Sequence, residues 1–405
     1  MISSSGFQDS DKKLKVIILH NIINPHVNPL FEAISNLPDI SLKVYFLSES
    51  AKDRKWSVET KLPFQYEILS NTVLNLHDRE RGLFPFVINP SIGLKLFKER
   101  YDVLVCSGWE SPSAYMALLV CKLRKKRFVL WSGTTVNEKS SRWKFTTPFK
   151  KLLAAKSDAC ISYGTLSREF LVSLGAEKRK TFISYNTVDV EYFRDRANSA
   201  RNERRKILDK LGVSGDSSII LYVGQLIQRK GIDHLLKAYG RLRREDTSAS
   251  LFIVGYGPEE RALKEMCIRD NIPDVHFKSF IDLPDLPEIY AVSAVFVLPS
   301  KIEVWGLVLN EAMACGLPII TTNTVGASRD LVEEGVNGFV VCAGDEEALY
   351  LGMKTLVSDR PLRERMGRES LRIISGFTYK NVVRGFQDAF EFVNRSKSSM
   401  SSAGP

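Results

Sequence analysis

The sequence predicts an α/β protein of two domains, each a doubly wound parallel β-sheet with helices on both faces. Three observations predict this. The chain has 405 residues, more than one hydrophobic core usually organises, so two domains of about 150 to 200 residues are expected. Short runs of Val, Ile, Leu and Phe alternate with helix-length segments, the pattern of a parallel sheet. A hydrophobic share of 44% with 26% charged residues is typical of a globular protein rather than a disordered one.

The first series of apolar runs predicts the N-terminal domain, which we expect to span 14–195. A polar tail, 1–13, precedes it and is expected to be disordered. The expected buried strands are Leu14–Leu19, Leu42–Leu47, Val103–Cys106, Phe128–Trp131, Ala159–Tyr163 and Thr181–Tyr185.

A second series predicts the C-terminal domain, 206–375. Between the two domains, 195–206 shows no apolar face and is interpreted as a connection. A helix at 376–394 is expected to pack back on the N-terminal domain, and 395–405 is expected to be a disordered tail. The expected strands are Ile219–Val223, Leu251–Val254, Val275–Phe277, Ala294–Leu298, Ile319–Thr322 and Phe339–Val341.

The net charge of +10 is unevenly distributed. Residues 1–200 hold 30 Lys and Arg against 20 Asp and Glu, whereas residues 201–405 hold 27 of each. The excess indicates either a solvated basic face or attraction to an anionic membrane or acceptor. Nucleic acid is not expected as a partner because no binding motif accompanies the charge. The sequence shows no secretory signal and no apolar run of the roughly 20 residues that a transmembrane helix needs. We therefore expect a cytoplasmic protein. The expectation includes peripheral contact with the cytoplasmic face of the membrane.

The most informative stretch runs from Leu298 to Pro318. A buried strand ends at Pro299, a short loop carries Glu303, and a helix carrying Glu311 starts near Gly306. Ligands of open parallel sheets bind at the carboxyl ends of the strands, where Glu303 falls. The N–H groups of Gly306, Leu307 and Val308 at the helix start suit a diphosphate, and a carboxylate such as Glu311 can accept hydrogen bonds from ribose hydroxyls. Spacing alone favours the simpler interpretation that Glu311 is an exposed helix acid and Glu303 an ordinary loop acid.

Together these residues resemble glycosyltransferase family 4, whose signature is two glutamates separated by seven residues. Here the pair is Glu303 and Glu311 within a context of the form PS-x-x-E-x-x-G-L-V-x-x-E-A-x-A-x-G-x-P. The resemblance implies the GT-B fold, two Rossmann-like doubly wound parallel-sheet domains facing a cleft. It also implies that Glu303 contacts the transferred sugar and Glu311 the ribose.

The segment Tyr222–Leu236 is similar to a second family motif. It places Lys230 where the family has a lysine that neutralises the donor pyrophosphate, charge that grows as the glycosidic bond breaks. Gln225 stands where the family usually has Arg. Arg229, which precedes Lys230, could supply the missing positive charge. Turn glycines expected to edge the donor pocket are Gly224, Gly255 and Gly257.

The N-terminal half resembles the family only weakly. Family members commonly carry a Gly-rich loop after the first strand and a His in the acceptor-side domain, whereas His20–His26 has no glycine and Leu130–Thr135 has no histidine. His26 and Glu110 fall at predicted strand ends facing the cleft. His26 and Glu110 are the acceptor-side catalytic candidates, in addition to the catalytic candidates Glu303 and Lys230. Both His26 and Glu110 could also be ordinary loop residues.

The resemblance implies a retaining hexosyltransferase that moves a sugar from a UDP- or GDP-sugar to a hydroxyl of a glycan or polyprenyl-linked acceptor. No cofactor or metal is expected: the cysteines lack zinc-site spacing, and the Asp-x-Asp at 9–11 lies in the polar tail. Two alternatives stay open. A sugar-nucleotide epimerase on a similar scaffold would convert the donor alone, and a non-catalytic basic binding protein would keep the fold with a decayed site.

Overall fold

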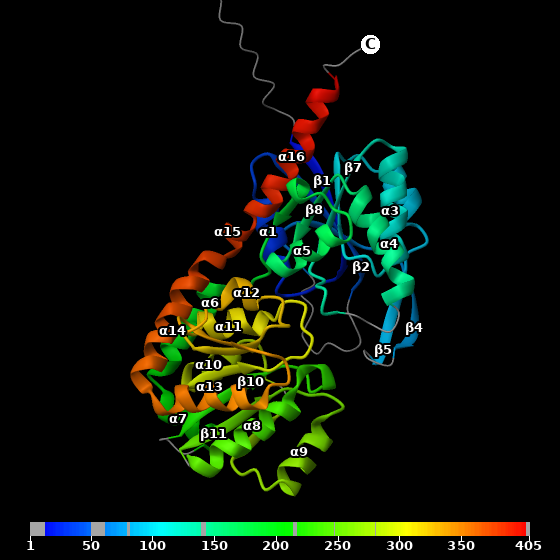
Figure 1. Ribbon diagram of the computed structural model, residues 1–405. Helices are drawn as coiled ribbons and strands as arrows, with labels where there is room; N and C mark the ends of the chain where they lie inside the picture. Colours follow the sequence, from blue (N-terminus) through cyan, green and yellow to red (C-terminus); the bar gives the residue numbers. More distant parts are fainter. Residues whose placement is uncertain are drawn as a thin grey trace, which may run out of the picture.

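The computed structural model describes residues 13–49, 61–78, 82–138, 143–213, 217–246, 248–279 and 281–401. They form two parallel β-sheets, one in each half of the chain, with helices packed around them (Figure 1). The expected N-terminal tail, including the Asp-x-Asp at 9–11, lies outside the described residues apart from Lys13.

The N-terminal sheet has seven parallel strands in the order β3-β2-β1-β6-β7-β8-β9. All six expected strands form, and β3 and an antiparallel hairpin, β4–β5, were not anticipated. The strands are β1 (Leu14–Ile22), β2 (Ile40–Ser48), β3 (Gln65–Ile68), β4 (Thr72–Asp78), β5 (Gly82–Ile88), β6 (Val103–Ser107), β7 (Arg127–Ser132), β8 (Ala159–Ser162) and β9 (Thr181–Ile183).

Two hydrophobic clusters lie on opposite faces of this sheet. One contains residues of α1 (Asn28–Ser35) and of the C-terminal α16 (Arg384–Ser401). The other contains residues of four helices: α2 (Ile92–Lys98), α3 (Pro112–Leu123), α4 (Trp143–Lys156) and α5 (Thr165–Ser173).

The C-terminal sheet has six parallel strands in the order β12-β11-β10-β13-β14-β15. They are β10 (Ser218–Val223), β11 (Ala249–Val254), β12 (Val275–Lys278), β13 (Val295–Leu298), β14 (Ile319–Thr322) and β15 (Gly338–Val341). The helices of this half are α8 (Ile232–Glu245), α9 (Glu260–Arg269), α10 (Leu286–Val292), α11 (Leu307–Ala314), α12 (Ser328–Leu331), α13 (Glu346–Ser358) and α14 (Arg360–Ile374). The strand order reverses between β10 and β13, and such a reversal is where an open α/β sheet binds ligands.

The expected connection at 195–206 is not a loop but parts of two helices, α6 (Val190–Arg201) and α7 (Arg204–Leu211). The interpretation was wrong because Phe193, Ala197 and Ala200 lie three or four residues apart and are buried together on one side of α6. The small alanines gave no strong hydrophobic signal. The Arg204 side chain also bonds the carbonyl of Val292, which ties α7 to the C-terminal domain.

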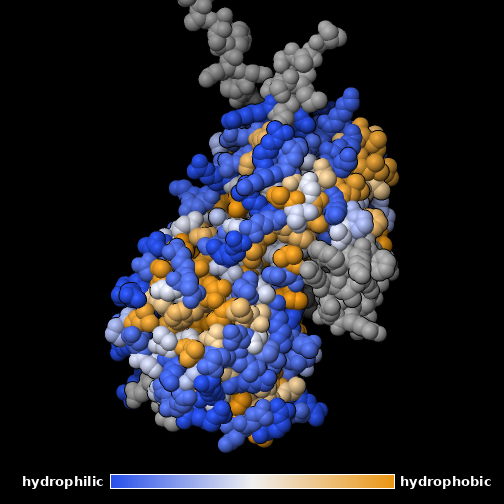
Figure 2. All heavy atoms as spheres, in the orientation of Figure 1, coloured by the Kyte–Doolittle hydropathy of each residue, from blue (hydrophilic) through white to orange (hydrophobic). Residues whose placement is uncertain are grey.

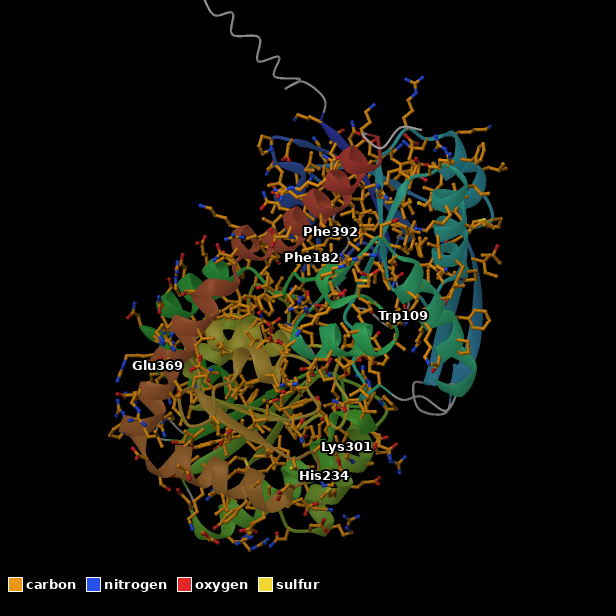
Figure 3. The ribbon with its side chains drawn as sticks, turned by 45° about the horizontal axis from the view of Figure 1, so that its top comes forward. Trp109, Phe182, His234, Lys301, Glu369 and Phe392 are labelled. Atoms are coloured by element: carbon orange, nitrogen blue, oxygen red, sulfur yellow. The ribbon has the colours of Figure 1, made fainter. Side chains whose placement is uncertain are left out.

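The chain ends on the N-terminal domain. After α14, α15 (Tyr379–Val382) and α16 run back from the C-terminal half (Figure 1), and Phe386 and Phe390 of α16 are buried in the N-terminal core. Phe392 meets Phe182 of β9 with ring centroids 5.7 Å apart (Figure 3). Helix α16 continues to Ser401, so the expectation of disorder from residue 395 is wrong as far as 401; 402–405 lie outside the described residues.

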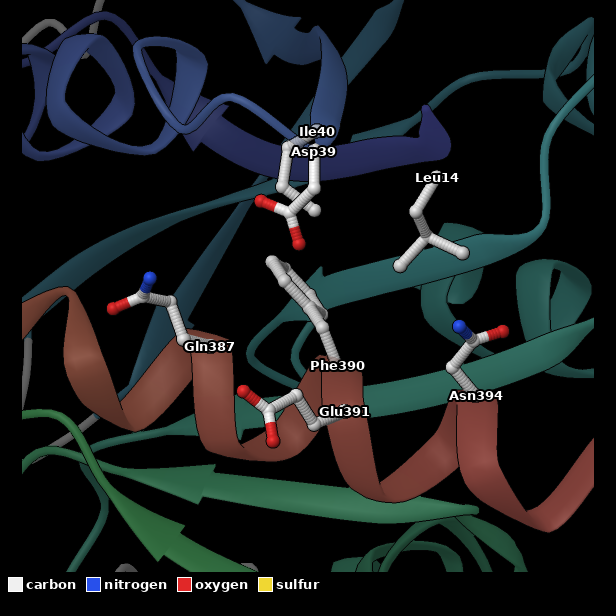
Figure 4. Close-up of a pocket in the computed structure, with 7 residues that line it drawn as sticks. All are labelled: Leu14, Asp39, Ile40, Gln387, Phe390, Glu391 and Asn394. Carbon is white, nitrogen blue, oxygen red and sulfur yellow. The ribbon is translucent and has the colours of Figure 1, made fainter. Parts of the chain in front are cut away.

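A cavity of about 140 Å³ lies at the seam between α16 and the start of β1 (Figure 4). It opens at the edge of the sheet where β1 begins, whereas the candidate site below lies where the strands end. Its lining residues are Leu14, Asp39, Ile40, Gln387, Phe390, Glu391 and Asn394.

Candidate functional site

Close backbone packing shapes the carboxyl ends of β10 and β11. Gly255 has φ +156°, and a Cβ atom there would lie 1.8 Å from the carbonyl oxygen of Gly224. A Cβ atom at Gly257 would lie 2.2 Å from the carbonyl oxygen of Leu226. Because a Cβ atom at either distance would clash with the carbonyl oxygen, these turns require glycine. The loops after the two strands therefore lie directly against each other.

Lys230 and Glu303 form an ion pair at the point where the strand order reverses. Lys230 ends a short 3₁₀ helix after β10, and Glu303 follows β13. The two side chains are only 11% and 12% exposed. Gly231, at φ +66°, lets the chain turn here, since a Cβ atom would lie 2.3 Å from the carbonyl oxygen of Pro299. A charge this far out of water needs a partner, and each of the two residues supplies one to the other.

The charges around Glu303 keep it ionised. Burial raises the pKa of its carboxyl, but the positive charges of Lys230 and Arg229 and the hydrogen bond from Lys230 outweigh burial, so its pKa lies below the usual value. Arg229 is held by a 3.2 Å bond from its guanidinium to the carbonyl of Ile302. Two cations thus lie beside one carboxylate.

Glu311 lies on α11 and is almost fully buried. Its Oε2 accepts a 2.7 Å hydrogen bond from the hydroxyl of Tyr290 on α10. Burial raises the pKa of Glu311 to about 7, although the Tyr290 bond opposes the shift. From the sequence we expected this carboxylate to accept hydrogen bonds from a ribose. In the structure one of its two oxygens already accepts a hydrogen bond from Tyr290.

The remaining donor-side candidates lie at the start of α11 and just after the end of β10. Gly306 is the N-cap of α11 with φ +95°, and Leu307 and Val308 form its first turn, where backbone N–H groups lack helical partners. The backbone carbonyl of Gln225 accepts a 3.0 Å bond from the hydroxyl of Tyr222. The start of α11 thus lies next to the loop of Glu303.

The two acceptor-side candidates lie on separate loops of the N-terminal domain. Glu110 is exposed, and its Oε2 accepts a 3.1 Å bond from the backbone N–H of Trp109 just before α3. His26 follows β1, and its carbonyl accepts a 2.8 Å bond from the hydroxyl of Tyr379.

Sequence reasoning missed Tyr379. Burial is the largest cause of its raised pKa, followed by the negative charges of Asp189 and Glu311. Tyr379 therefore lies close enough to Glu311 to feel its charge while it holds the His26 loop. Because it comes from the C-terminal segment, some 68 residues beyond Glu311 in the chain, no local pattern could have placed it here.

The two domains meet at their strand ends. Asp330 of α12 accepts 2.9 Å and 2.5 Å bonds from the backbone N–H and hydroxyl of Thr165, the first residue of α5. A Cβ atom at Gly164 would lie 2.4 Å from the ring of Trp305. Exposed Arg329 and Glu169 pair beside them at 2.8 Å. These contacts make the carboxyl ends of the two sheets face each other. The sequence did not single out the five residues that join Trp305 here, which are Asp330, Thr165, Gly164, Arg329 and Glu169.

Across the described ranges, no group of three or more His, Cys, Asp or Glu side chains is placed to hold a metal ion. In the same part of the chain no helix is both long and apolar enough to cross a membrane.

The fold is shared with a known structure. The HepE protein of Anabaena, solved in complex with UDP, superimposes with a TM-score of 0.70 at 17% identity, covering 96% of this chain and 100% of HepE. Two parallel-sheet domains whose strand ends face each other, together with this likeness, define the GT-B class of fold.

The sequence comparison finds its family match in the C-terminal half of the chain. Residues 203–372 match the model of the group 1 glycosyl transferases. An uncharacterized glycosyltransferase of Methanocaldococcus jannaschii is 27% identical over 54% of this chain and 56% of its own length. The GDP-mannose-dependent alpha-(1-6)-phosphatidylinositol monomannoside mannosyltransferase of Mycolicibacterium smegmatis is 30% identical over 40% and 44%. The matches thus span about half of these curated relatives. Residues 203–372, most of the C-terminal domain, are thus similar to the group 1 glycosyl transferases.

Proposed function

We propose that this protein is a retaining, metal-independent hexosyltransferase that uses a UDP- or GDP-sugar. The observation that carries the proposal is the buried Lys230–Glu303 pair beside the start of α11, the helix that holds Glu311. The match of residues 203–372 to the group 1 glycosyl transferases supports sugar transfer. A nucleotide-sugar donor is supported by the UDP in the HepE structure and by the GDP-mannose dependence of the mycobacterial relative.

The charged groups of the site would contact different parts of the donor. The donor diphosphate would meet Lys230, Arg229 and the N–H groups at the start of α11, which stabilise anionic oxygen. Glu303 would face the transferred sugar as a carboxylate, because its pKa is lowered. The Oε1 of Glu311 would meet the ribose.

In the proposed reaction the acceptor hydroxyl oxygen forms a bond to the anomeric carbon as the bond from that carbon to the phosphate oxygen breaks. The bonding electrons leave with the nucleoside diphosphate, which also takes the hydroxyl proton. Attack on the face that the leaving group vacates retains the configuration. Glu110 and His26 are the acceptor-side candidates, and the acceptor is a glycan or a polyprenyl-linked saccharide at the cytoplasmic membrane face.

The first experiment measures donor binding. We would record thermal unfolding of the wild type, Lys230→Ala and Glu311→Ala with UDP, GDP, ADP and dTDP and their glucose or mannose conjugates. A ligand at 100 times its Kd adds about 2.7 kcal/mol of stability, so one nucleotide series should raise the wild-type Tm and neither variant's. Lys210→Ala, on α7, is the matched control and should respond like wild type.

Turnover separates the alternatives. A transferase should release nucleoside diphosphate slowly with water as acceptor and faster with a suitable sugar. An epimerase would interconvert the donor without releasing diphosphate, and a binding protein would show the Tm shift with no conversion. A wild type that no nucleotide stabilises contradicts the donor site altogether.

A further inference from the structure

Three helices of the N-terminal domain form a layer that is apolar on its outside as well as its inside. Helices α2 and α3 are packed closely enough that a Cβ atom at Gly93 would lie 3.2 Å from the side chain of Met116. Helices α3 and α4 touch through Tyr115 and Phe149, whose ring centroids are 6.0 Å apart. Their inward residues, among them Leu96, belong to the cluster on this face of the sheet.

The outward residues of the same helices are large, apolar and exposed. Leu94 is 70% exposed and Leu123 is 67% exposed. The spacing is three or four residues on each helix, so the exposed side chains form stripes rather than scattered single positions. The full set is Leu94 and Phe97 on α2, Met116, Leu119 and Leu123 on α3, and Phe149 and Leu152 on α4. Figure 2 shows hydrophobic residues gathered at the upper right edge of the molecule, where Figure 1 places α3.

The charge of this layer has one sign. Helices α2, α3 and α4 contain seven lysines and no Asp or Glu. Arg124, Lys125 and Lys126 follow α3 directly. Acids from outside the three helices pair with some of these basic residues: Glu67 with Lys95, Asp158 with Lys122 at 3.0 Å, and Asp102 with Lys126 at 3.7 Å. The layer therefore presents apolar stripes bordered by positive charge.

We propose that this face of α2, α3 and α4, which we name the apolar–basic face, binds the surface of an anionic lipid bilayer. Exposed apolar stripes mark interaction surfaces. A bilayer surface matches both features, because Leu and Phe side chains enter the acyl boundary while lysines reach the anionic headgroups. A nucleic acid would satisfy the lysines but not the apolar stripes.

The apolar–basic face adjoins the acceptor side of the site. Helix α3 belongs to it, and the loop that precedes α3 carries Glu110 and Trp109. The Lys150 ammonium of α4 lies 5.3 Å from the centre of the Trp109 ring. A bilayer bound here would thus lie next to the N-terminal side of the domain junction, where a lipid-linked acceptor would have to enter.

The test is cosedimentation with lipid vesicles of two compositions, phosphatidylcholine alone and phosphatidylcholine with phosphatidylglycerol. The wild type should bind the anionic vesicles much more tightly, and added salt should weaken binding. Leu119→Ser/Leu123→Ser should lower the partition coefficient at least about tenfold, because each leucine loses its burial in lipid. Lys125→Ala/Lys151→Ala should lower it about 25-fold, a factor of about five for each charge.

The controls have the same chemistry on the other domain. Ile268, on α9, is 82% exposed, and Lys210 is exposed on α7; Ile268→Ser and Lys210→Ala should bind like wild type. All the substituted positions are exposed, so the variants should keep the wild-type Tm and its shift with nucleotide. This shift separates failure of the membrane proposal from failure of the donor site.

Three results would overturn the proposal. The first is equal affinity for neutral and anionic vesicles, and the second is unchanged binding by both double variants. The third is a wild type that light scattering shows to be a dimer and that does not bind vesicles, together with a leucine variant that is a monomer. The apolar stripes would then be a contact between two copies of the chain.

Discussion

The two domains share one architecture but treat charge in opposite ways. The C-terminal domain buries charge at the point where its strand order reverses: Lys230 and Glu303 form a nearly buried pair, and Glu311 is buried against Tyr290. At the end of β1 the N-terminal domain instead buries neutral His20 among aromatic rings, with centroids 5.2 Å from Phe31 and 5.6 Å from Trp131. Its positive charges lie outside, on α2, α3 and α4.

The difference follows from what each domain would bind. A buried cation can stabilise the growing charge of a leaving diphosphate because little water competes for it. A lipid surface is met only by exposed residues, so lysines that serve it must stay in water. Under these two proposals the same doubly wound architecture would bind a small anionic ligand in one half and a broad anionic surface in the other.

The largest expected effect tests the catalytic half of this comparison. Glu303→Gln should lower donor hydrolysis and sugar transfer by about 10² to 10³-fold, since it removes the carboxylate that we propose faces the transferred sugar. The nucleotide-induced Tm shift should remain, because Lys230 and the start of α11 are unchanged. Rates of nucleoside diphosphate release measure the effect, and Glu265→Gln on the exposed side of α9 is the control. A variant that keeps wild-type rates removes Glu303 from the reaction.

Glu311 should make the C-terminal domain less stable as pH rises. Its folded pKa is about 7 against 4.5 in the unfolded chain, so its contribution is fully present below about pH 4.5 and is lost as pH passes through 7. The loss is about 3 kcal/mol at 1.36 kcal/mol per unit. Urea unfolding of wild type and Glu311→Gln between pH 4.5 and 8 measures it, and the variant should lack this slope. Parallel curves for the two proteins would contradict the buried position of Glu311.

His20 should act on the N-terminal domain in the opposite direction. Burial lowers its pKa to about 4 from 6.5, so its contribution is present above about pH 6.5 and is lost as pH falls through 4. The size is again about 3 kcal/mol. Hydrogen exchange resolved by domain should show the β1 and β7 amides losing protection on acidification, and His20→Phe should suppress the change. If both domains lose protection in the same pH direction, the contrast drawn between them is wrong.

A smaller effect is expected where the domains meet. Asp330→Ala leaves the N–H and hydroxyl of Thr165 without their acceptor, so it should lower the free energy of unfolding by about 1 to 3 kcal/mol. Calorimetry should then show the two domains unfolding less cooperatively. Arg329→Ala, the neighbouring position, breaks only an exposed pair and should cost less than about 1 kcal/mol. Equal effects of the two substitutions would show that Asp330 does not join the domains.

Much of the fold and part of the site could be predicted because they depend on short stretches of chain. Alternating apolar runs predicted every strand of the two large sheets except β3. The Glu303–Glu311 spacing predicted a loop acid followed by a helical acid, because a strand, turn and helix are set by residues that are neighbours in the chain. The weakly apolar stripe of α6 escaped this reasoning because alanines carry little hydrophobic signal, although they are small enough to pack closely.

Other features were decided only by tertiary structure. Lys230 pairs with Glu303, 73 residues away in the chain, because β10 lies next to β13 in the sheet. Glu311 has a pKa of about 7 because it is buried. Asp330 meets Thr165 across 165 residues. Sequence determines which residues can be charged and which elements carry them. The folded chain decides which charges lose their water and which groups replace it, and that exchange sets the pKa values and the chemistry of the site.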